Sequence, residues 1–134
     1  MFVDAAAIVA ILADEPEARR CSEALVRAEA PITSPIAVWE AAMALARADK
    51  LDVSIDVSAA LVTRFLEERA ITVRDLPPHR EAMRLSLEAA SRFRDKAIRL
   101  NLADCFHYAC AKHYAVPILS TSEEFRSTDL ETVP

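Results

Sequence analysis

Glycine is absent from this 134-residue sequence, although about 7% would be usual. Without glycine the chain has no glycine-rich loop of the kind that cradles phosphate groups. Both the dinucleotide-binding fingerprint and the P-loop are therefore excluded. This removes the commonest nucleotide-binding α/β proteins from consideration.

Basic residues and long apolar runs are also scarce. Sixteen Lys and Arg against 21 Asp and Glu give a net charge of −5, which argues against a strongly basic nucleic-acid-binding protein. No apolar run reaches the about 18 residues that a membrane span needs, and no basic leader precedes the acid at position 4. We expect a cytoplasmic protein without membrane contact, whose three cysteines are reduced thiols.

Predicted strands and helices alternate along the chain. Apolar and β-branched runs predict strands at residues 1–3, 31–33, 71–76 and 117–121. Helical spacing of apolar residues, with its start and stop signals, predicts helices at 5–13, 16–30, 35–48, 54–69, 79–91 and 101–116. With short connections, this order predicts one domain over residues 1–134, a three-layer α/β/α fold with a mainly parallel central sheet.

Several acidic residues lie where apolar surroundings are expected. Asp4 directly follows the first strand, and Glu123 and Glu124 follow the last. The carboxyl ends of parallel strands lie at one edge of the sheet, where ligands bind, so these acids are expected to lie at that edge. Glu40 has apolar residues three and four positions away on both sides, which predicts that it shares the buried stripe of its helix. A buried carboxylate needs a compensating partner, and a cation is the obvious one.

Asp104 lies three residues after Asn101, the expected cap of its helix, and this spacing resembles a capping box with Asp in place of Glu. If Asn101 takes the capping role, the Asp104 carboxylate is left to face the other acids. Each acid also has an ordinary interpretation, as a helix cap at Asp4 and Asp104, an ion pair at Glu40, or an exposed loop residue at 123 and 124. Together they match a site for Mg²⁺ or Mn²⁺, which prefer oxygen ligands and catalyse phosphodiester hydrolysis.

A short basic segment precedes Asp104 and contains Arg94, Lys96 and Arg99. Its ordinary interpretation is a solvated loop. If the chain acts on RNA, these three residues are the candidate contacts for the phosphate backbone.

Four stretches in order, VDAAAIVAIL, SPIAVWE, LNLADCFHYACAKHYAVPIL and EEFRSTDL, resemble PIN-domain proteins, and in particular the VapC-type toxins of bacterial type II toxin–antitoxin systems. The resemblance implies a PIN-like α/β/α fold and a Mg²⁺- or Mn²⁺-dependent endoribonuclease. It also implies a cognate VapB-type antitoxin as partner, RNA as substrate, and a homodimer.

The same resemblance assigns roles to individual residues. It implies a catalytic acidic set of Asp4, Glu40, Asp104 and one of Glu123 and Glu124, with Asp4, Asp104 and Glu40 as metal ligands. The polar residues expected to support this set are Asn101, Ser34 and Thr121.

The sequence departs from the family pattern at several places. Ala6 stands where a hydroxyl residue is common, and Ala103 and Ser122 stand where glycine is usual. In the last motif, Glu123 and Glu124 occupy the positions of two aspartates. A catalytically inactive PIN-fold module that binds an antitoxin-like partner is therefore the alternative hypothesis.

A zinc site built from Cys105, His107, Cys110 and His113 is disfavoured. Successive residues of a helix turn by about 100°, so one helix spreads these side chains too far apart to surround one zinc ion.

Overall fold

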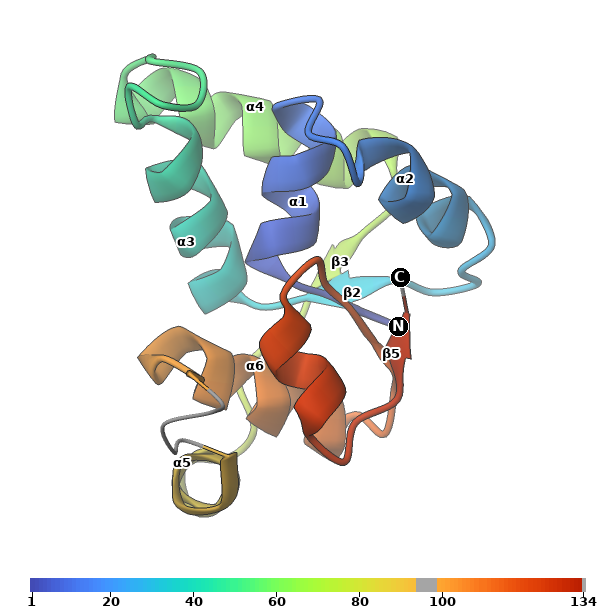
Figure 1. Ribbon diagram of the computed structural model, residues 1–134, viewed down its shortest axis with the longest axis vertical. Coiled ribbons are helices and arrows are strands. Elements are labelled where there is room, and N and C mark those ends of the chain that lie inside the picture. Colours follow the sequence, from blue (N-terminus) through green and yellow to red (C-terminus); the bar gives the residue numbers. More distant parts are fainter. Residues whose placement is uncertain (94–98, 134) are drawn as a thin grey trace.

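The computed structural model describes residues 1–93 and 99–133, and its centre is a sheet of five short strands (Figure 1). The strands are β1 (Phe2–Val3), β2 (Ile32–Thr33), β3 (Thr72–Val73), β4 (Ile118–Leu119) and β5 (Thr132–Val133). They lie in the order β3-β2-β1-β4-β5, and every pairing is parallel. The predicted parallel sheet is confirmed, with β1 at its centre.

Helices cover both faces of this sheet, as Figure 1 shows. The first four, α1 (Ala5–Leu12), α2 (Ala18–Val26), α3 (Pro35–Leu45) and α4 (Ile55–Glu68), lie on one side, and α5 (His79–Phe93) and α6 (Leu102–His113) lie on the other. Because helices cover both faces, the central strands are fully buried, with Phe2, Val3, Ile118 and Leu119 in the core. The predicted three-layer α/β/α architecture is confirmed. Among the described helices, none combines the length and apolar character needed to cross a membrane.

Several predicted boundaries are too wide. The predicted strand at 71–76 pairs only over Thr72–Val73, at the edge of the sheet. The predicted helix at 16–30 is α2, which begins at Ala18, where no side chain caps the first turn. After residue 121, where no element was predicted, the structure has the 3₁₀ helix η1 (Glu123–Ser127) and the edge strand β5.

The absence of glycine is visible at the helix ends. Helices α1, α4 and α6 are each followed by a residue in the left-handed region, Asp14, Ala70 and Ala115, all at φ 51°. The amides after the two alanines bond back into the helix, from Ile71 to the Leu66 carbonyl at 2.8 Å and from Val116 to the Ala111 carbonyl at 3.1 Å. These are Schellman caps, in which glycine is usual. Alanine in this conformation costs about 1 kcal/mol.

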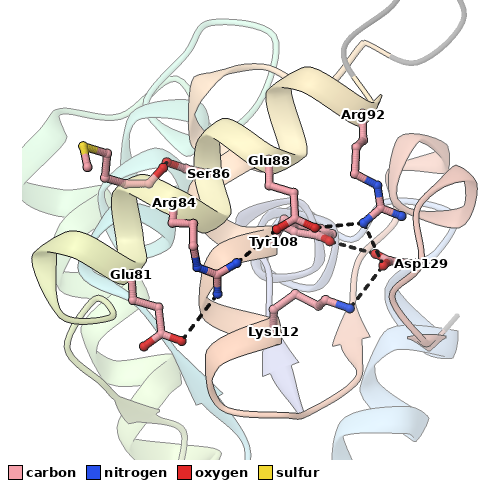
Figure 2. A network of polar contacts seen from close by, with 9 residues as sticks. Glu81, Arg84, Ser86, Glu88, Arg92, Tyr108, Lys112 and Asp129 are labelled. Carbon is pink, nitrogen blue, oxygen red and sulfur yellow. Dashed lines mark hydrogen bonds and ion pairs between the residues drawn. The ribbon is translucent and has the colours of Figure 1, made fainter.

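A polar network fastens the C-terminal segment to α5 and α6 (Figure 2). Asp129 accepts a hydrogen bond from the Tyr108 hydroxyl at 2.8 Å and lies 3.2 Å from both Arg92 and Lys112. Arg92 also pairs with Glu88 on its own helix. These contacts hold the chain just before β5, so the network helps to place that strand beside β4.

Candidate metal centre

The first turns of α1, α3 and α6 gather at the carboxyl edge of the sheet (Figure 1). Asp4 directly follows β1 there, as the N-cap of α1, and is 2% exposed. The β1–β4 register pairs Val3 with Leu119, so the residues that follow, Asp4 and Ser120, lie side by side. Asp4 lies at the carboxyl edge, as its position after the first strand predicted, and the strand order places it at the centre of that edge.

Both oxygens of the Asp4 carboxylate have donors. Oδ1 accepts a hydrogen bond from the Ala5 amide at 2.8 Å and lies 2.7 Å from His107 Nδ1, and Oδ2 accepts a hydrogen bond from the Ser120 hydroxyl at 2.6 Å. Burial by itself would raise the pKa of Asp4, but the charge of His107 and these hydrogen bonds outweigh it and lower the pKa. Asp4 is therefore an anion held in one orientation.

His107 is the second member of the site and is completely buried. Its Nε2 lies 3.6 Å from Glu40 Oε2, and its ring packs on Phe2 with 5.8 Å between centroids. Within the described part of the chain, neither ring nitrogen has a partner in hydrogen-bonding geometry, despite the short Asp4 contact. Burial lowers the pKa of His107, but the Asp4 and Glu40 charges outweigh it and the pKa lies above its usual value.

Glu40 is half-buried, with 32% of its side chain exposed. The prediction that it belongs to the buried stripe of its helix is wrong, since Ala37 and Ala41 fill that stripe while Trp39, 64% exposed, marks the outer face. Burial, together with the nearby negative charges of Asp4 and Asp104, raises the pKa of Glu40 in spite of His107. Glu40 therefore stands at the mouth of the site, open to solvent.

Ligand atoms of Asp4, Glu40 and His107 all lie within 4.8 Å of one another, close enough to hold one metal ion. These three residues are called the central triad below. Two of them, Asp4 and Glu40, were predicted as metal ligands, and His107 was not.

Asp104 lies beside the central triad, without belonging to it. Its Oδ2 accepts a hydrogen bond from the Asn101 amide at 2.7 Å, and Asn101 Oδ1 accepts one from the Asp104 amide at 3.0 Å. The expectation that capping by Asn101 leaves the whole Asp104 carboxylate available is wrong, because the capping box is reciprocal and uses one of its oxygens. Burial raises the pKa of Asp104, and the charges of Asp4 and Glu124 raise it further.

The two glutamates of η1 differ in surroundings. Glu123 is exposed and pairs with Arg126 at 3.3 Å. Glu124 is partly buried, accepts a hydrogen bond from the Ser122 hydroxyl, which lowers its pKa, and acts electrostatically on Asp104. The structure therefore brings Glu124 toward the acidic site and leaves Glu123 at the surface.

The other predicted site residues have varied positions. The Ser34 hydroxyl caps α3 by accepting a hydrogen bond from the Ala37 amide at 3.2 Å. Thr121 lines a cleft of about 220 Å³ together with Ala6, Glu40 and the Glu15–Lys50 ion pair. Arg99 is exposed and acts electrostatically on Glu124. Arg94 and Lys96 lie outside the described residues.

A second, mostly apolar groove of about 370 Å³ lies on the other side of Glu40. It runs between α3 and α6, and the apolar side chains that line it are Ile36, Trp39, Leu102, Ala103 and Phe106. Glu40 lines both cavities, so it stands between the cleft that holds the Glu15–Lys50 ion pair and the apolar groove.

Sequence analysis missed two residues of the site, and a signal existed for each. His107 follows Asp104 by three residues, which places both on one face of α6. Ser120 follows the last apolar residue of β4, and in a parallel pair with β1 that position lies next to Asp4. Both sequence patterns indicate a site residue only when the element packed beside that residue is known.

Comparisons with known proteins agree with this geometry. The family model described as PIN domain matches residues 1–130. A VapC ribonuclease of Rhizobium meliloti (strain 1021) is 32% identical, covering 96% of this chain and 98% of that protein, and ribonuclease VapC30 of Mycobacterium tuberculosis is 30% identical, covering 99% and 98%.

Two solved structures share the fold at 14% identity. The Mycobacterium tuberculosis toxin VapC20, described as cleaving the sarcin–ricin loop, has a TM-score of 0.76, with 99% of this chain and 98% of that chain covered. A chain of a toxin–antitoxin complex from Klebsiella pneumoniae has a TM-score of 0.66, with 96% and 92% covered. Fold, acidic site and sequence similarity together show that the chain belongs to the PIN-domain family and, within it, to the VapC ribonucleases.

Proposed function

We propose that this protein is a divalent-metal-dependent endoribonuclease and the toxin of a type II toxin–antitoxin pair. The observation that carries the proposal is the central triad, Asp4, Glu40 and His107, whose ligand atoms lie within 4.8 Å at the carboxyl edge of a parallel sheet. Relatives of nearly the same length, 30–32% identical, are named VapC ribonucleases. The metal is Mg²⁺ or Mn²⁺ in this proposal.

The residues present fit such an ion. Several carboxylates converge there, and burial together with the negative charge of Asp4 raises the pKa values of Glu40 and Asp104. A buried nitrogen, His107 Nε2, faces the same place without a hydrogen bond to any described residue. A bound divalent cation would lower the pKa of a water molecule and neutralise developing charge on the phosphodiester.

The residues of the site have different roles in this proposal. Asp4 is fixed by Ser120 and the Ala5 amide, so it offers a rigid anionic ligand. Glu40, half-exposed at the mouth, holds the metal from the solvent side, where RNA arrives. Asp104 and Glu124 complete the negative set, and exposed Arg99 contacts the RNA backbone, a role proposed equally for Arg94 and Lys96.

A VapB-type antitoxin is the proposed partner. Exposed large apolar residues on α2, α3 and α4, among them Val26, Trp39 and Ile55, support this proposal, and so does the apolar groove beside Glu40. An amphipathic segment could cover such a surface. Homodimerisation and cytoplasmic location stay predictions.

The test is RNA cleavage by the purified full chain after treatment with a chelator. We expect structured RNAs to be cleaved only when Mn²⁺ or Mg²⁺ is restored, and Asp4→Asn and Asp104→Asn to abolish cleavage while their circular dichroism stays native. Glu67→Gln, an exposed acid on α4, is the matched control and keeps full activity. Cleavage that persists in EDTA or in Asp4→Asn would refute the proposal. A folded, metal-loaded wild type that cleaves nothing would favour the inactive interaction module.

A further inference from the structure

One buried polar group in the site has no counterpart among the predicted ligands. His107 is 0% exposed, yet neither of its ring nitrogens meets hydrogen-bonding geometry with any residue that the structure describes. A buried polar group without a hydrogen bond destabilises the folded protein. The charge of Asp4, 2.7 Å away, compensates Nδ1, but Nε2 has Glu40 only at 3.6 Å, so Nε2 is the nitrogen that calls for a ligand.

The contacts of the ring fix which nitrogen is available. Nδ1 lies 2.7 Å from Asp4 Oδ1, and a carboxylate oxygen offers only lone pairs. Two lone pairs at this distance would repel, so the proton lies on Nδ1. If a metal ion displaces the Nε2 proton, Nε2 offers its lone pair, and Glu40 Oε2 lies 3.6 Å from it.

This is the arrangement of a histidine that binds a metal. Metal-binding histidines commonly donate their other ring N–H to a carboxylate, which fixes the ring and its tautomer. Here Asp4 would orient His107, and Nε2 and Glu40 would face one ion from two helices, α6 and α3. All three residues have ligand atoms within 4.8 Å of one another.

We propose that His107 binds the metal ion directly through Nε2, and that the site thereby prefers a first-row transition-metal ion such as Mn²⁺ over Mg²⁺. The proposal rests on the proposed function, because it concerns the same site. Imidazole nitrogen is a poorer ligand for Mg²⁺, a hard cation that takes oxygen ligands, than for transition metals. A purely carboxylate site lacks this discrimination.

The experiment uses Mn²⁺ as a paramagnetic probe of the full chain. Pulsed electron paramagnetic resonance of the Mn²⁺ complex detects a coordinated imidazole by its ¹⁴N modulation. We expect this modulation in wild type, and we expect it to change to the ¹⁵N pattern when the protein is labelled with [¹⁵N]histidine. The comparison of unlabelled and labelled protein uses wild type alone, so it stays informative even if a variant fails to fold.

His107→Asn separates the two functions of the ring. An asparagine amide can still donate to Asp4 in place of Nδ1–H, but it offers nothing near Glu40. We expect this variant to lose the ¹⁴N modulation and to weaken Mn²⁺ binding at least about tenfold, with less than about threefold change for Mg²⁺ in calorimetric titration. His113→Gln, which alters a histidine paired with Glu81 at 3.0 Å, is the control and keeps both signals.

The outcomes are distinguishable. Bound Mn²⁺ without nitrogen modulation in wild type would overturn the role of His107 and leave a carboxylate-only metal nuclease intact. Wild type that binds no Mn²⁺ would overturn both proposals. Loss of modulation in His113→Gln would show that the nitrogen ligand is a different histidine.

Discussion

Replacing Glu40 by Gln is expected to have opposite effects in the absence and in the presence of metal. In the metal-free protein, burial and the negative charges of Asp4 and Asp104 raise the pKa of Glu40. At pH 7 its ionised form therefore costs stability, and this cost disappears as the pH falls below the folded-state pKa. Glutamine resembles the neutral form, so the substitution removes the cost.

The magnitude follows from the spacing of the central triad. Two like charges at 4.8 Å, the upper limit for the Asp4 and Glu40 ligand atoms, repel by about 1 kcal/mol in water and about 3 kcal/mol at an effective dielectric constant of 20. Attraction between Glu40 and His107 offsets part of this. We expect Glu40→Gln to gain about 1 kcal/mol in EDTA, or roughly 3–5 °C in Tm for a chain of this size.

Bound metal reverses the order of stability of wild type and Glu40→Gln. At a concentration about a hundred times its Kd, an ion stabilises wild type by about 2.7 kcal/mol, whereas a variant that binds about a hundredfold more weakly gains only about 0.4 kcal/mol. Glu40→Gln is then the less stable protein by about 1 kcal/mol.

The assay is thermal unfolding in EDTA and in Mn²⁺, with Glu67→Gln as the control that shows neither change. If Glu40→Gln is destabilised in EDTA and gains as much from Mn²⁺ as wild type, then Glu40 is a structural residue and the reasoning is refuted.

Two further predictions concern stability away from the site. Ala115→Gly removes a Cβ from an exposed left-handed position and should raise the free energy of unfolding by about 0.5–1 kcal/mol. The control Ala60→Gly, inside α4, should lower the free energy of unfolding by about 1 kcal/mol. If denaturant titrations show the same change for both variants, the capping argument is contradicted. Asp129→Asn should cost about 1 kcal/mol at pH 7 through weaker contacts with Tyr108, Lys112 and Arg92. Although burial opposes it, these contacts lower the pKa of Asp129 from its usual value. The stability difference from wild type should therefore shrink as the pH falls through the folded-state pKa, and a difference that stays constant with pH would contradict a role for the Asp129 charge.

The sequence predicts the sheet and the position of Asp4 well, for a physical reason. An acid directly after a buried central strand has to lie at the carboxyl edge, whatever the details of packing. Strand β5 could not be predicted in the same way, because it is two residues long and the polar contacts of Asp129, rather than an apolar run, help to place it. The burial of Glu40 was overestimated because apolar neighbours on one helix do not reveal whether a second element covers them.

His107 shows where sequence reasoning stops. The sequence shows its spacing from Asp104, but its importance depends on Asp4, which follows strand β1, and on Glu40 of helix α3. By contrast, the capping box of Asn101 and Asp104 depends on local spacing alone, so the sequence indicated it and the hydrogen bonds confirm it.

The most direct test of the central claim is the chemistry of the RNA ends. Metal-assisted hydrolysis by water leaves 5′-phosphate and 3′-hydroxyl ends, whereas attack by the neighbouring 2′-hydroxyl leaves a 2′,3′-cyclic phosphate. Mass spectrometry of the fragments produced with Mn²⁺ should show 5′-phosphate and 3′-hydroxyl ends, with no fragments in EDTA. Cyclic phosphate ends, formed equally in EDTA, would contradict a metal centre built on Asp4, Glu40 and His107.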